Sequence, residues 1–147
     1  MNSLVAVKVT GLQAIEEQLL DLGAEFGAKL LAQSARKAFK PVLDAAIAAC
    51  PVDTGDLRAA IKVRVTKPES GDTIVSVGIR ITSGKGKGKI PPSKRWHWIE
   101  FGTVHQAAHP FLRPALEANA QAVADLLTVE LRSKIDKAIR KRARAAA

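Results

Sequence analysis

Apolar side chains recur every three or four residues over three segments of the chain, a spacing typical of helices that bury one face. These segments are 12–22, 24–50 and 110–139. Pro41 lies inside the second segment and cannot donate a backbone hydrogen bond, so a bend is predicted near residues 37–41. Because Pro51 disfavours helical geometry in the residue before it, this helix is predicted to end at Cys50.

Other segments alternate apolar and polar positions, or are short and mostly apolar, as strands in a small sheet are. These segments are 4–9, 61–67, 73–82 and 96–101. Residues 68–72 supply turn residues between the second and the third, which predicts a hairpin. The pattern therefore predicts an α+β fold: a small antiparallel sheet of three or four strands packed against a long kinked helix and a long C-terminal helix.

The length and composition fit one globular domain. A chain of 147 residues, 47% hydrophobic and 25% charged, can bury a core and is not disordered throughout. The domain is predicted to span residues 1–147, with its core at 4–131. Residues 83–95 are too rich in glycine, lysine and proline to pack and are predicted to form a mobile basic loop, while 132–147 form a basic tail.

The net charge of +9 is concentrated in two segments. Residues 1–50 sum to zero and residues 96–131 to −3, whereas 85–95 carry +5 and 132–147 carry +6. Such segments attract polyanions by counterion release, so nucleic acid is a predicted neighbour; solvated surface segments are the alternative. The candidate DNA-facing residues are Lys85, Lys87, Lys89, Lys94 and Arg95.

Features of several other protein classes are missing. Cys50 is the single cysteine, so the chain forms no internal disulfide and can mature in a reducing cytoplasm. No apolar run approaches the roughly 20 residues that span a bilayer. The start, MNSLVAVKVTGLQ, lacks the charged beginning and apolar block of a signal peptide. No membrane partner is therefore expected.

Two groups of polar residues invite a chemical interpretation. His97, His105 and His109 lie near Glu100, but their spacing runs through a predicted loop without an HExxH or a Cys/His pairing. We therefore expect histidines of the surface or of an interface rather than metal ligands.

The second group is Asp53 and Asp56, which could be a carboxylate pair for acid/base work. The segment Asp53–Asp56 is instead predicted to cap the start of a short helix by a side-chain acceptor. No GxSxG, phosphate-binding glycine loop or catalytic cysteine signature is present. We expect no enzyme activity, no catalytic residue, no cofactor and no metal.

Three motifs carry a family resemblance. They are PVDTGDLRAAI at residues 51–61, WIEFGT at 98–103 and AHPFLRPAL at 108–116. In this order and at these separations they resemble the minor tail or neck proteins of long-tailed bacteriophages, a head–tail joining and tail-completion family similar to the tail-completion protein Z of phage lambda. The resemblance covers about residues 24–130. Trp96, Trp98, the Gly-Lys loop and the basic tail depart from the family pattern.

The motif residues are expected to shape the backbone. They are Pro51, Asp53, Thr54, Gly55, Leu57, Glu100, Phe101, Gly102, Thr103, Pro110, Phe111 and Pro114. Pro51 and Gly55 are predicted to fix a tight turn, and Gly102 to adopt positive φ at the end of a strand. Pro110 is predicted to open the last helix, with Phe111 as its apolar anchor.

The resemblance implies a structural virion component, assembled in the cytoplasm of the bacterial host. Such a subunit forms a homo-oligomeric ring at the head–tail junction or tail end, contacts other neck, connector or tail proteins, and lets DNA pass without sequence specificity. Trp96 and Trp98 are candidate subunit contacts, since large aromatic residues often anchor interfaces. The alternative is a small basic nucleic-acid-binding protein, although no helix-turn-helix, zinc finger or stacking platform is visible. A third hypothesis, a toxin or metal-dependent enzyme, depends on the histidines alone.

Overall fold

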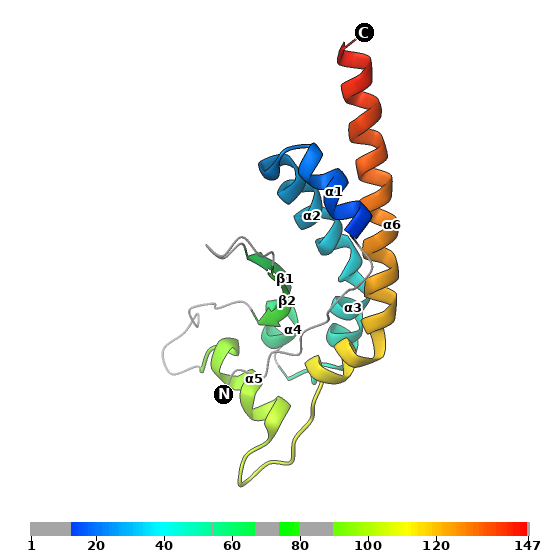
Figure 1. The fold of residues 1–147 in the computed structure, drawn as a ribbon. Helices are drawn as coiled ribbons and strands as arrows, with labels where there is room; N and C mark the ends of the chain where they lie inside the picture. Colours follow the sequence, from blue (N-terminus) through cyan, green and yellow to red (C-terminus); the bar gives the residue numbers. More distant parts are fainter. Residues whose placement is uncertain (1–12, 54, 67–73, 80–89, 147) are drawn as a thin grey trace.

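The computed structural model describes residues 13–53, 55–66, 74–79 and 90–146, and the predicted strand at 4–9 lies outside them. These residues are mostly helical, with one antiparallel pair of strands (Figure 1). The elements are α1 (Gln13–Asp21), α2 (Ala24–Ala38), α3 (Lys40–Ala49), α4 (Asp56–Ala60), β1 (Ile61–Thr66), β2 (Ile74–Ile79), α5 (Pro92–Phe101) and α6 (Leu112–Ala146).

The long N-terminal helix is bent where the sequence predicted. Phe39 separates α2 from α3 with φ −82° and ψ 0°, and Pro41 stands in the first turn of α3. Proline is tolerated there because the first N–H groups of a helix have no intrahelical acceptor. Cys50 is extended, with φ −66° and ψ 124°, so the helix ends as Pro51 requires.

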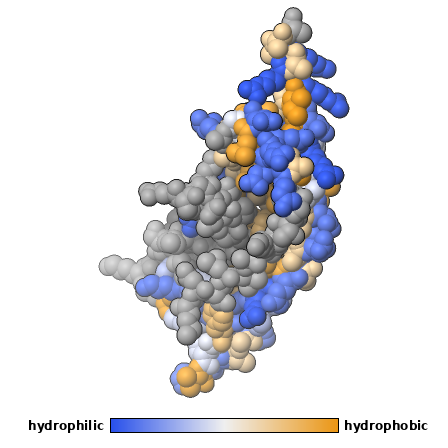
Figure 2. Space-filling view, in the orientation of Figure 1, coloured by the Kyte–Doolittle hydropathy of each residue, from blue (hydrophilic) through white to orange (hydrophobic). Residues whose placement is uncertain are grey.

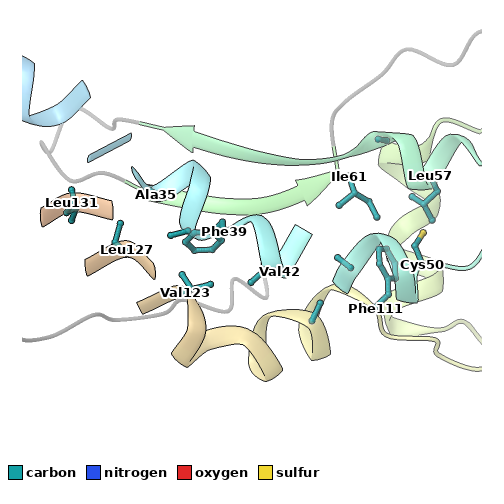
Figure 3. Packing of buried hydrophobic residues seen from close by; sticks show 14 of the residues in the cluster. Ala35, Phe39, Val42, Cys50, Leu57, Ile61, Phe111, Val123, Leu127 and Leu131 are labelled. Atoms are coloured by element: carbon teal, nitrogen blue, oxygen red, sulfur yellow. The ribbon is translucent and has the colours of Figure 1, made fainter. Parts of the chain in front are cut away.

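Helix α6 runs along α2 and α3, and the core lies between them (Figures 1 and 3). Its buried side chains are Ala115 near the start and then Val123, Leu127, Leu131 and Ile135, spaced four residues apart. They face Phe39 and Val42 together with buried alanines of α2 and α3. Small alanine side chains let helices approach closely, so this interface is well packed despite the scarcity of aromatic residues.

The two strands form one antiparallel pair, in register from Ile61 opposite Ile79 to Thr66 opposite Ile74. In β1, Ile61 is buried while Lys62 is exposed, which is the predicted alternation. Helices α2 and α3 lie between this pair and α6 (Figure 3). In the described residues the predicted sheet of three or four strands is thus a single pair, and its predicted turn at 68–72 lies outside them.

The prediction of a strand at 96–101 is wrong, because these residues end helix α5. Trp96, Ile99 and Glu100 are its inward positions, which is helical spacing and not alternation. Pro92 occupies the first turn, where its fixed φ favours a helix. The predicted mobile loop is therefore also wrong at 92–95, which are helical.

The segment 132–146, predicted as a basic tail, continues helix α6. Ile135 is 1% exposed, so the core extends beyond residue 131. Near its end, Arg142 Nη1 donates to the carbonyl oxygen of Asp21 at 3.2 Å, which ties α6 to the last residue of α1. The helix begins at Leu112, two residues after the predicted Pro110.

Candidate functional site

The carboxylate of Glu100 joins the end of α5 to the start of α6. Its Oε2 accepts the backbone N–H groups of Phe111 at 2.8 Å and Leu112 at 3.0 Å, and its Oε1 accepts that of Arg113 at 3.0 Å. The first N–H groups of a helix lack intrahelical acceptors and carry partial positive charge, so a carboxylate there is well satisfied. Glu100 can therefore be only 5% exposed, and it connects the second motif to the third.

The turn after α5 depends on Gly102. Its backbone has φ +74° and ψ 178°, the positive φ that the sequence predicted. An added Cβ would lie 2.8 Å from the nitrogen of Ala108 and 2.9 Å from the oxygen of Gln106, which are backbone atoms. Thr103 and Gln106 close the turn, with the N–H of Thr103 donating to the carbonyl of Gln106 at 2.8 Å. Glycine is thus required both by conformation and by space.

The first motif forms the turn between α3 and β1. Helix α4 begins at Asp56 after Gly55, which has φ +77° and makes no side-chain cap hydrogen bond. The cap position itself is a glycine, so it supplies no side-chain acceptor, and Thr54 of the predicted capping segment lies outside the described residues. Arg58 stabilises the turn instead: its Nε donates to the carbonyl oxygen of Ile47 at 2.9 Å, near the end of α3.

The three motifs meet around one concave site with a volume of about 490 Å³. It is lined by Pro51, Val52, Asp53, Gly55, Leu57, Arg95, Trp98, Ile99, Gln106 and His109. Residues of all three motifs are in this lining although they are far apart in the sequence. The motifs therefore build one surface feature together, and we call it the motif cavity.

Polar groups of the motif cavity are few. Arg95 Nη1 lies 4.0 Å from Asp53 Oδ2, and the Asp53 side chain is 90% exposed. Within the described part of the chain, the buried Nε of Arg95 makes no hydrogen bond. Asp53, Gln106 and His109 also line the cavity, and the remaining lining residues are mostly apolar, so a cavity of this kind can accept an apolar side chain of another protein.

The Glu100 carboxylate and the histidines were the candidates for chemistry near the motifs. Both oxygens of Glu100 are occupied by backbone donors, so this carboxylate is not placed to accept a proton from a substrate. Among the described residues, no three His, Cys, Asp or Glu side chains are grouped so that they could hold a metal ion. In the same residues, no helix has the length and apolar content needed to cross a membrane.

Apolar side chains are exposed in the first two motifs and just after the second, and two of them, Val52 and Trp98, line the motif cavity. Val52 is 60% exposed, Trp98 43%, Phe101 52% and Val104 97%. Trp96 differs from Trp98, because it packs partly buried against the core, with its ring centroid 3.7 Å from that of His97. Of the two tryptophans predicted as subunit contacts, Trp98 is thus the accessible one at the cavity.

The pKa values of two groups near the motifs are shifted. Burial raises the pKa of the Cys50 thiol, an effect that the positive charge of Arg58 partly opposes, so the thiol stays neutral around pH 7. The hydrogen bond and charge of Glu117 raise the pKa of Arg113, whose Nε lies 2.8 Å from Glu117 Oε1. Neither shift produces a reactive group.

Other predicted site residues are dispersed. Lys94 is exposed on α5, whereas Arg95 faces Asp53 in the motif cavity. Thr54, Lys85, Lys87 and Lys89 lie outside the described residues. The capping role of Glu100 was not predicted from the sequence. The available signal was a single carboxylate within an apolar segment that precedes the start of a helix.

Comparison with protein families gives one match. Residues 13–102, more than half of the chain, match the family described as "Bacteriophage HK97-gp10, putative tail-component". No curated protein and no solved structure shows significant similarity. The match includes the first motif and the second motif as far as Gly102, two residues after the carboxylate that caps α6. The chain therefore belongs to the HK97-gp10-like family of bacteriophage tail components.

Proposed function

We propose that this tail component is a neck or tail-completion subunit, which forms a homo-oligomeric ring at the head–tail junction or tail end through which DNA passes. The family places the protein in the virion and implies a structural, non-enzymatic role. The position in the particle, the ring and the likeness to protein Z of phage lambda are parts of the proposal.

The observation that carries it is the joint surface of the three motifs. The exposed side chains of Val52 and Trp98 line the motif cavity and make it a partly apolar, accessible surface. Exposed apolar patches with an accessible aromatic residue are typical of protein interfaces. Since the same motifs carry the family resemblance, the simplest occupant is another protein of the tail, including a second copy of this chain.

Ring formation follows from size. One subunit of 147 residues cannot enclose a DNA duplex, so a junction protein repeats one head-to-tail contact until the ring closes. Such a contact needs two different surfaces on each copy. The motif cavity provides one, and the surface of α6 is available as the other.

The test is complementation of particles assembled without this protein. We expect these particles to have unjoined or defective tails, and purified protein to restore infectivity. Trp98→Ala should restore it at least tenfold less well, whereas the control Leu20→Ala, on α1 at 65% exposure and outside both proposed contact surfaces, should act as the parent does. Normal infectious particles in the absence of the protein would overturn the proposal and favour a nucleic-acid-binding protein instead.

A further inference from the structure

Four cations share one face at the C-terminal end of α6. Lys137, Arg140, Lys141 and Arg144 are spaced at i, i+3, i+4 and i+7, so their side chains lie on the same side of the helix. All four residues are exposed. They extend over about 10 Å of helix axis. We call this group the C-terminal basic stripe.

The stripe is turned away from the body of the molecule. The opposite side of α6 carries the buried residues Leu131 and Ile135, and Arg142 reaches back from a different side to the end of α1. The last turns of α6 extend beyond α1 and α2 (Figure 1), and hydrophilic side chains dominate this end of the surface (Figure 2). A large ligand can therefore approach the stripe without displacing another element.

The charges of the stripe are not neutralised within the described residues. Lys29, Lys37 and Arg113 each form an ion pair with a glutamate, whereas none of the four stripe residues has such a partner there. Asp136 is the one acidic residue of segment 132–147. Four neighbouring cations repel one another, so the arrangement gains most from a ligand with closely spaced negative charges.

We propose that the C-terminal basic stripe binds the phosphate backbone of double-stranded DNA without reading its sequence. The inference rests on the proposed function, in which DNA passes the subunit. A duplex carries one negative charge per about 1.7 Å, so about six phosphates lie along the length of the stripe. The nearest exposed large apolar side chain is Ile139, 46% exposed, which helical spacing places on another side of α6, so the stripe presents charge without an apolar anchor and favours a polyanion over an acidic protein.

Salt-dependent binding of the purified full chain to a fluorescent 30-base-pair duplex tests this proposal. We expect anisotropy to show binding that weakens steeply between 50 and 200 mM salt. In a variant carrying Arg140→Gln, Lys141→Gln and Arg144→Gln, the slope of log affinity against log salt should become shallower by about 2.7, which is about 0.9 for each cation removed. The affinity of the parent should therefore drop about 40-fold more than that of the variant over this range.

The matched control carries Arg36→Gln, Lys62→Gln and Arg132→Gln, which removes the same residue types from exposed positions on three other surfaces. It should keep most of the parent's salt dependence. Equal losses in both variants would mean that net charge alone attracts DNA, and an unchanged stripe variant would place the contact elsewhere; either result overturns the proposal. Tighter binding of the parent to a fluorescent poly-glutamate peptide than to the duplex would also overturn it.

Circular dichroism should show that both variants keep the parent's helicity, because glutamine is a good helix former. Complementation separates this inference from the proposed function. If the stripe variant restores tail joining and binds DNA as the parent does, the proposed DNA contact of the stripe is refuted and the proposed tail function is not. If particles assembled without the protein are normal, the proposed tail function is refuted, whatever the duplex experiment shows.

Discussion

At the scale of single residues, Glu100 shows why an acidic residue can be buried without a cationic side chain beside it. Three backbone N–H groups of the α6 start surround its two oxygens. Removing the charge leaves part of these donors without a good acceptor, and buried unsatisfied groups are costly.

We predict that Glu100→Gln lowers the free energy of unfolding by about 1–3 kcal/mol, because the amide has one acceptor oxygen where the carboxylate has two. The matched control is Glu117→Gln, which removes an exposed partner of Arg113 in the same helix and should cost less than about 1 kcal/mol. Urea denaturation of both variants measures the difference. Equal stabilities for parent and Glu100→Gln would show that the cap is dispensable.

Gly102 and Gly55 share a positive φ but differ in ψ and in the space around an added Cβ. Both have φ near +75°, but a Cβ at Gly55 meets nothing within 4 Å. We predict that Gly55→Ala costs about 1 kcal/mol, and that Gly102→Ala costs at least about 2 kcal/mol, because its ψ of 178° is a region restricted to glycine and its Cβ meets the backbone. The melting temperatures of the two variants are the measurement. Similar decreases in both would show that crowding at Gly102 adds no cost.

At the scale of elements, the C-terminal half of α6 is part of the core. Ile135 is 1% exposed, whereas Ile139 one turn later is 46% exposed. We predict that Ile135→Ala costs about 2–4 kcal/mol through the cavity it leaves, and Ile139→Ala less than about 1 kcal/mol. Denaturant titration of the two variants decides whether this segment packs. A loss of stability below about 0.5 kcal/mol for Ile135→Ala would show that the C-terminal part of α6 is solvated and does not pack.

The sequence predicted those elements whose pattern is long and regular. The bend near Phe39, the end at Cys50 and the alternation in β1 follow from Pro41, Pro51 and periodicity. Helix α5 was mistaken for a strand because six apolar-rich residues fit either period, and the prolines that start it were assigned to a loop.

The site was less predictable than the helices. Its motifs were visible in the sequence, but their meeting around one cavity depends on contacts between α4, α5 and the turn before α6, which no local pattern encodes. The capping of α6 by Glu100 is likewise a contact over 11 to 13 residues.

At the scale of the whole molecule, the two tryptophans of α5 provide a test that separates folding from assembly. Trp96→Ala removes a ring packed against the core and should lower stability by about 2 kcal/mol or more. Trp98→Ala should leave the melting temperature within a few degrees of the parent, since this ring is 43% exposed, while weakening assembly. Calorimetry and light scattering on both variants are the measurements. If Trp96→Ala loses assembly and Trp98→Ala does not, the subunit contact does not involve Trp98 in the motif cavity.

Helix α6 also connects the three motifs to the basic end of the molecule. Its 35 residues span about 52 Å, one end held at the Glu100 carboxylate and the other carrying the cations of residues 137–144. A tilt of only about 5° between α5 and α6 moves the far end by about 4–5 Å over this length. Because α6 packs along α2 and α3 and is tied to α1 by Arg142, such a tilt would carry these helices with it.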